Sequence, residues 1–208
     1  MLTPEKLSTA LIAARNSIAQ DGELFADSRK KLLDLIEELS AVEHSNAGYL
    51  RRSRLAFICA QKSLLIIKPY EEVFDFAQLM LSRGRTALLG KYNLKFLEKD
   101  NGEFHTEVNN LFEHGEDAFA SVYAGMACFS AINTILYDAD FESIGQYEKN
   151  ISPDDWSACF YASLAVSGSA VWENKNGSHE RLRYWHWYLD NAIPWAWNVE
   201  LDLTLPNE

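Results

Sequence analysis

Cysteine is scarce in the 208-residue sequence, which lacks both the paired cysteines of a disulfide-rich extracellular protein and the ligand spacing of a small zinc-binding domain. Its three cysteines, Cys59, Cys128 and Cys159, are odd in number and lie far apart in apolar helical contexts. They exclude a disulfide framework and a paired-cysteine zinc site, so we expect buried free thiols in a reducing compartment. The first six residues lack a basic region followed by an apolar stretch. We therefore expect no secretory signal and a cytoplasmic protein.

Motifs for cofactor or metal chemistry are also missing. There is no phosphate-binding glycine loop and no dinucleotide fingerprint, so the sequence predicts no cofactor. His105 and His114 are too far apart to form a metal pair on one helix face, and no metal site is expected. His186 and Asp190 are one helical turn apart, the spacing at which a carboxylate can orient an imidazole. Because no nucleophile or metal ligand accompanies this pair, the sequence favours a protein that is not an enzyme.

Basic residues are scarce in the second half of the chain. The formal net charge is -11, and residues 1–98 carry 14 basic and 12 acidic side chains, whereas residues 99–208 carry 5 and 18. Such acidity repels phosphate backbones and anionic lipid, and it steers cationic partners toward the protein. Nucleic acid is therefore not an expected partner. The same acidity is equally consistent with a surface that only maintains solubility.

One stretch requires a test for a membrane span. Residues 118–137 carry no charge over about the length that crosses a bilayer. Two serines, an asparagine and a threonine interrupt the stretch, Asp117 and Asp138 bracket it, and no flanking cluster of Lys and Arg provides an orientation signal. We therefore predict a buried core helix and no membrane association.

Helical spacing of apolar residues recurs along the chain, while strand alternation is hard to find. These patterns predict a single all-α domain of about eight helices over residues 1–198, with a C-terminal tail over residues 199–208. Asp100-Asn101-Gly102 is typical of a turn, and Gly84 or Gly90 is expected to break or cap a helix. The predicted helices cover residues 3–18, 27–42, 47–67, 69–92, 104–112, 118–137, 154–172 and 178–193.

Two residue clusters stand out within these helices. Arg51, Arg52 and Arg54 crowd one helix start, and we expect them to pair with acids on neighbouring helices. All six tryptophans lie between Trp156 and Trp197, and residues 181–190 form a helix that is apolar or aromatic nearly all round. Such a helix is either core, the commoner outcome for an aromatic stripe, or it presents a contact patch or a lined pocket.

The same C-terminal region resembles a known family. Asp155-Trp156 heads a small-residue helix toward Gly168 and Trp172, and Arg181 then precedes the run RYWHWYLDNAIP at residues 183–194. This pattern resembles immunity protein family 5 of bacterial polymorphic toxin systems over the last quarter of the chain, and the rest matches as a succession of helices. The resemblance implies an all-α cytoplasmic antidote that binds a toxin encoded beside it and has no catalysis of its own. A basic toxin, such as a nuclease, is expected because acidic surfaces speed association with basic clefts.

The aromatic helix supplies the predicted site. The residues expected to contact the partner, or to shape the contact site, are Arg181, Arg183, Tyr184, Trp187 and Tyr188. If the aromatics instead line a pocket, Trp156, His186 and Asp190 belong to it, and the protein is a helical enzyme or a small-ligand binder. A third alternative is a homo-oligomeric adaptor that assembles through the same aromatic face. Burial of Tyr184, Trp187 and Tyr188 would exclude their direct contact with a partner.

Overall fold

The computed structural model describes residues 3–43, 46–139, 141, 157–170, 177–200 and 202–203. Within these residues the chain is helical and contains no strand, which confirms the all-α prediction. Short 3₁₀ helices η1 (Leu64–Ile67), η2 (Leu111–His114) and η3 (Glu116–Ala118) join longer ones, and η6 (Tyr188–Ala192) is a π-helix. The α-helices are α1 (Glu5–Asn16), α2 (Ala26–Ser40), α3 (Ala47–Ser63), α4 (Glu71–Leu88), α5 (Leu94–Asn110), α6 (Phe119–Tyr137), α7 (Ala158–Ser167), α8 (Ser178–Trp187) and α9 (Ile193–Trp197).

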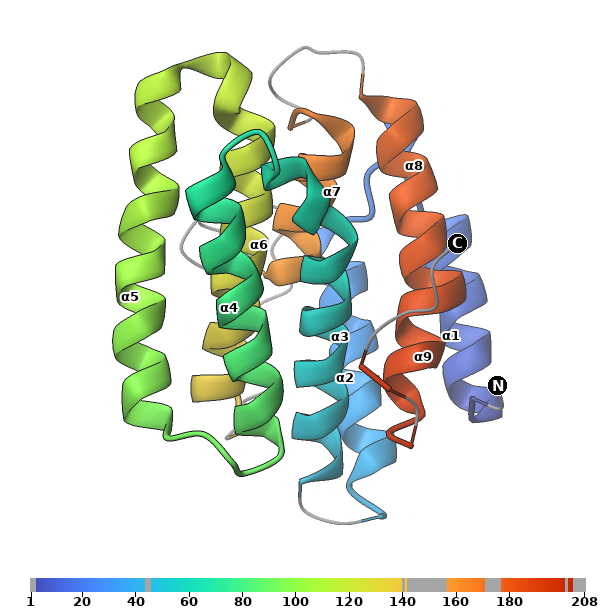
Figure 1. Ribbon diagram of the computed structural model, residues 1–208. Helices are drawn as coiled ribbons and strands as arrows, with labels where there is room; N and C mark the ends of the chain where they lie inside the picture. Colours follow the sequence, from blue (N-terminus) through green and yellow to red (C-terminus); the bar gives the residue numbers. More distant parts are fainter. Residues whose placement is uncertain are drawn as a thin grey trace.

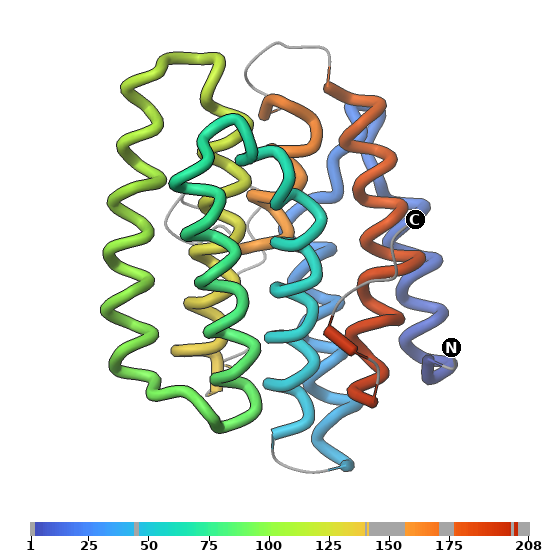
Figure 2. Tube along the Cα trace, viewed as in Figure 1, coloured from blue at the N-terminus to red at the C-terminus, as the bar shows by residue number. Residues whose placement is uncertain are grey.

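The long helices run roughly side by side, with α5 at one edge of the bundle and α1 at the other (Figures 1 and 2). Helix α3 lies near the middle, and every residue from Arg51 to Ala60 on it is buried. It packs against α2, α6, α7 and α9. Helix α3 is therefore the element through which segments from both ends of the sequence meet.

Helix α6 is the second central helix, between α3, α4, α5 and α7. Its small side chains Ala124, Ala127, Cys128 and Ala131 are fully buried, which lets its neighbours approach closely. By length and composition, residues 116–137 could also cross a membrane, with a mean hydropathy of 1.5. Their place in the bundle is that of the predicted core helix.

Two predicted helix boundaries were wrong, one because of tertiary contacts and one because of a left-handed glycine. Residues 100–102 form no turn but lie inside α5. The Asn101 side chain is buried there, and its Nδ2 donates to the Phe129 carbonyl at 3.3 Å and to Asn133 Oδ1 at 2.9 Å on α6. The helix predicted over residues 154–172 ends at Ser167, where Gly168 takes a φ of +69°. Its predicted start at residues 152–155 lies outside the described residues.

Other boundaries follow the sequence more closely. Helix α4 ends at Leu88, and Gly90, one of the two predicted break points, takes a φ of +69°. The last predicted helix stops at residue 193, before Pro194, whereas in the structure the chain continues through the π-helix η6 into α9, which contains Pro194. Proline lacks the N–H that would bond the carbonyl four residues earlier, and its ring crowds that carbonyl. The wider π turn relieves both problems while the helix continues.

Candidate functional site: a buried aromatic helix, a braced end and an acidic end

The aromatic helix α8 belongs to the core. Tyr184 is 2% exposed, Trp187 8%, and Tyr188 and Trp185 are fully buried. The prediction that Tyr184, Trp187 and Tyr188 contact a partner is therefore wrong for this conformation. The alternative that the aromatic stripe is core describes the structure. The aromatic residues of α8 pack, together with η6, against α7, α3 and α1, while His179, Glu180 and Arg183 form an exposed polar face.

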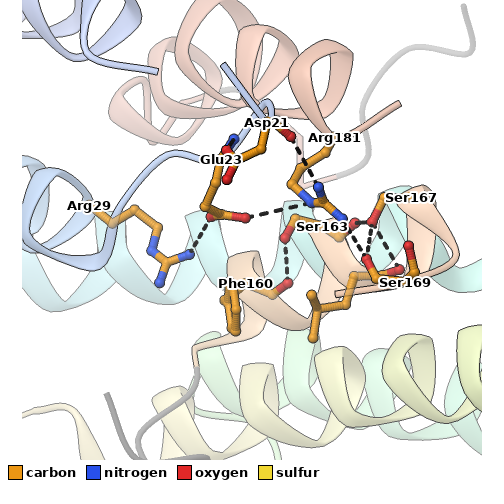
Figure 3. A network of polar contacts seen from close by, with 9 residues as sticks. Asp21, Glu23, Arg29, Phe160, Ser163, Ser167, Ser169 and Arg181 are labelled. Atoms are coloured by element: carbon orange, nitrogen blue, oxygen red, sulfur yellow. Dashed lines mark hydrogen bonds and ion pairs between the residues drawn. The ribbon is translucent and has the colours of Figure 1, made fainter. Parts of the chain in front are cut away.

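Arg181 is buried with the aromatics and fastens three segments together (Figure 3). Its Nη1 donates to the Asp21 carbonyl at 3.1 Å, and its Nη2 donates to the Ser169 carbonyl at 2.8 Å. Its Nε lies 3.6 Å from Glu23 Oε2. Arg181 thus joins α8 to the loop after α1 and to the segment after α7. This is a structural role, because its donors point to the protein's own acceptors.

Glu23 lies between Arg181 and Arg29, whose Nη1 is 3.4 Å from Glu23 Oε1 (Figure 3). Burial raises the pKa of Glu23 to about 7, although both arginines act to lower it. The Arg29 guanidinium also stands over the rings of Phe160, at 4.3 Å, and Trp185, at 5.2 Å. Sequence analysis missed this centre because a single acid in a loop carries no signal of the distant arginines that face it.

Two of the three residues of the predicted pocket lie in the described part of the chain. Asp190 is exposed and forms an ion pair with Arg15 of α1. His186 is half-buried, and within the described residues no hydrogen bond or ion pair joins it to Asp190. Trp156 lies outside the described residues. Among the predicted contact residues, Arg183 alone is exposed. The Trp187 ring instead contacts a lysine, since Lys62 Nζ lies 5.0 Å from its centre.

The three cysteines match their prediction, since Cys59, Cys128 and Cys159 are buried free thiols. Burial raises the pKa of Cys128 to about 12, so this group stays a neutral thiol at physiological pH. Burial also raises the pKa of Cys59 well above its ordinary value. These thiols therefore behave as small apolar core residues.

At one end of the bundle, α2, α4, α6 and α9 finish and α3 and α5 begin, and we call this the braced end (Figure 1). The buried Arg51 guanidinium bonds Glu43 Oε1 and Oε2 at 2.7 and 2.8 Å. It also donates to Ser40 Oγ at 2.9 Å and to the Trp197 carbonyl at 3.1 Å. The guanidinium lies 3.6 Å from the centre of the Trp197 ring. One side chain therefore holds the ends of α2 and α9 on α3.

Arg52 and Arg54 extend this bracing. Arg52 Nε donates to Asp138 Oδ2 at 2.5 Å, its Nη2 donates to the Asp138 carbonyl at 2.8 Å, and its Nη1 bonds Glu37 of α2. Arg54 Nη2 donates to the Asn198 carbonyl at 3.1 Å. The prediction that Arg51 and Arg52 pair with acids on neighbouring segments is confirmed. Arg54 also bonds a backbone carbonyl just after α9, where a helix end leaves acceptors unpaired.

The opposite end, residues 62–75 and 107–117, has a different charge pattern, and we call it the acidic end. It carries two lysines and seven carboxylates. Within the described part of the chain, no ion pair involves Glu71, Glu72, Glu107, Glu113 or Asp117. The Tyr70 and His114 rings, 5.1 Å apart, join the start of α4 to η2 here. Much of the net negative charge thus projects from one end without local compensation.

Taken together, a helical core that buries its arginines and aromatics and an uncompensated acidic end define an all-α domain whose distinctive chemistry lies in its surface charge. The family model described as immunity protein Imm5 matches residues 12–195, so the chain belongs to the Imm5 family. The match extends well beyond the C-terminal quarter that carries the sequence resemblance. No curated protein matches the chain.

Proposed function

We propose that this protein binds and neutralises a cognate toxin of a bacterial polymorphic toxin system. The observation that carries the proposal is membership of the Imm5 family over residues 12–195. Immunity protein families are generally non-enzymatic, which favours inhibition by occlusion of the toxin. The toxin would be the product of a neighbouring gene, and the protein would meet it in the cytoplasm.

The charge distribution supports a basic toxin as the partner. A surface with several unpaired carboxylates attracts cationic clefts over a distance and raises the rate of productive encounters. The acidic end has this character, whereas the aromatic helix α8 is covered by its neighbours. The contact surface that we propose is therefore the acidic end, in place of the aromatic residues named from the sequence.

Co-expression with the protein encoded by the neighbouring gene tests the proposal. We expect host cells that express the neighbour alone to stop growing, and cells that also express this chain to survive. The two proteins should then co-purify as a stable complex. A neighbour that is harmless alone, or one that stays toxic and never co-purifies with this chain, would overturn the proposal.

A further inference from the structure

Large apolar side chains remain exposed at the braced end. Val42, in the loop after α2, is 85% exposed, and Tyr137, at the end of α6, is 60% exposed. Scattered single apolar residues are normal on protein surfaces, but a group of them at one end of a bundle indicates a contact surface. The other members of the group are Leu89, Leu94, Phe96 and Val199.

Buried arginines hold the backbone beside these side chains. Val42 lies between Ser40 and Glu43, both of which Arg51 bonds, with its Nη1 2.9 Å from Ser40 Oγ and its Nη2 2.7 Å from Glu43 Oε1. Arg51, on α3, is itself buried. The loop that presents Val42 is therefore tied to the core on both sides of the residue.

The same arrangement occurs at the ends of two other helices. Tyr137 directly precedes Asp138, whose carboxylate and carbonyl both accept from Arg52. Val199 directly follows Asn198, whose carbonyl accepts from Arg54. Exposed apolar groups that are already held in place lose little conformational entropy when a partner covers them, which favours association.

One further contact links Tyr137 to the start of α5. The Tyr137 hydroxyl donates to Glu98 Oε1 at 2.7 Å. Glu98 is one helical turn after Leu94, so it shares a helix face with that exposed leucine. The apolar group therefore continues from α6 onto α5.

The charges around this group identify the occupant. Residues 34–43, 46–54, 83–100, 138, 198–200 and 202–203 carry eight basic and nine acidic side chains, so the braced end is nearly neutral. The exposed Lys91 and Lys95 lie at this end together with the exposed Glu43 and Glu200. A highly cationic partner gains little from such a surface. A surface that offers both signs can be complementary to itself about a two-fold axis.

Self-association is also favoured by the location of the unpaired charge. Two chains with a net charge of -11 repel one another, and contact through their acidic ends would bring uncompensated carboxylates together. Contact through the braced ends keeps these carboxylates at opposite extremes of the assembly, since the two ends lie at opposite ends of the bundle (Figure 1). We propose that the braced end is the interface of a two-fold homodimer, with a second copy of this chain covering Val42, Tyr137 and their apolar neighbours.

Sedimentation equilibrium of the full chain over a wide range of protein concentration tests the dimer. We expect wild-type protein to dimerise and Val42→Asp to weaken dimerisation by at least about tenfold, because a carboxylate would be buried at the contact. Leu65→Asp is the matched control, since Leu65 is an apolar residue 71% exposed at the acidic end, and it should leave the dimer intact. Circular dichroism checks that both variants fold.

Three outcomes would overturn this proposal. The first is a wild-type chain that stays monomeric at the highest concentration, and the second is a dimer that Leu65→Asp dissociates while Val42→Asp does not. The third is a monomer whose binding to the toxin is abolished by Val42→Asp, which would assign the braced end to the toxin. Because the dimer is measured without any toxin, its failure leaves the proposed function standing, and the reverse also holds.

Discussion

The two ends of the bundle use charge in opposite ways. At the braced end, Arg51, Arg52 and Arg54 are buried, and their partners are carboxylates and helix-end carbonyls. At the acidic end, carboxylates such as Glu113 and Asp117 stay exposed and have no ion pair within the described chain. The comparison teaches that a net charge of -11 does not show where charge stabilises the fold and where it is available to attract other molecules.

The two ends differ because a buried charge and an exposed charge have different energetic costs. A buried guanidinium loses its hydration, so it is tolerated only where acceptors replace the lost water. An exposed carboxylate keeps its hydration and contributes mainly through repulsion of its neighbours, which salt screens. Changes at the braced end should therefore alter stability, and changes at the acidic end should alter encounters with other molecules.

The largest expected effect is at Arg52, which is 3% exposed on its side chain and bonds both Glu37 and Asp138. We expect Arg52→Met to reduce the free energy of unfolding by about 3–5 kcal/mol, because it leaves partly buried carboxylates without their partner. Urea denaturation followed by circular dichroism measures the change. Lys68→Met, at an exposed lysine of the acidic end, should stay within about 0.5 kcal/mol of wild type. Equal effects at the two positions would refute the contrast between the ends.

Glu23 provides a pH-dependent test of burial. Its pKa is raised from the ordinary value of 4.5 to about 7, so between these values the folded state binds more protons than the unfolded chain. Stability should therefore fall as pH rises through this window, by up to about 3 kcal/mol from this group. Unfolding free energies measured at several pH values for wild type and Glu23→Gln give the difference. A wild-type slope that the Gln variant reproduces would show that Glu23 does not cause it.

Gly48 tests how tightly the braced end is packed. A Cβ at this position would overlap the Glu37 carboxylate and approach Arg52 Nη1 to 3.0 Å. We expect Gly48→Ala to cost about 1–3 kcal/mol by displacing this ion pair. Gly102, exposed in the middle of α5, has open space at its Cβ, and Gly102→Ala should stabilise by about 0.5–1 kcal/mol. Thermal denaturation of both variants provides the measurement, and a stabilising Gly48→Ala would contradict the packing described.

The smallest expected effect concerns encounter rate and rests on the proposed function. Replacing Glu71, Glu72 and Glu113 by Gln and Asp117 by Asn should slow toxin association by about tenfold at low salt, because the attractive field is reduced. Stopped-flow mixing with the purified toxin measures the rate. The control replaces Glu5 and Glu200, exposed acids outside the acidic end, by Gln. A control that slows association as much as the acidic-end variant would move the toxin contact away from the acidic end.

Local sequence patterns predicted the elements whose signals are local. Helical spacing predicted a helix over residues 3–18, where α1 buries Leu7, Leu11 and Ala14, and the glycine at position 90 marked the end of α4. The arginine cluster at the start of α3 correctly predicted pairing with neighbouring acids. In each case the deciding interactions are either within one helix or follow from the cost of burying an unpaired charge.

Tertiary partners decided what the sequence could not. The local sequence Asp100-Asn101-Gly102 is typical of a turn. The contacts that hold Asn101 inside α5 are with α6, which is distant in the chain and therefore invisible to local patterns. Periodicity indicated that α8 is apolar nearly all round, but it could not show which of its faces α1, α3 and α7 cover. The exposed residues that carry our proposals, such as Val42 and Glu113, have ordinary local sequences. Their significance comes from which end of the bundle they occupy.

The contacts of Arg51 and Arg54 with the Trp197 and Asn198 carbonyls have a consequence for biosynthesis. Residues near the start of α3 leave the ribosome long before the segment that supplies their last acceptors. Until α9 emerges, the nascent chain cannot bury these guanidinium groups without leaving donors unsatisfied. Completion of the core is thus coupled to synthesis of α9, and a stop codon placed before Trp197 should yield a product recognised by proteases as unfolded.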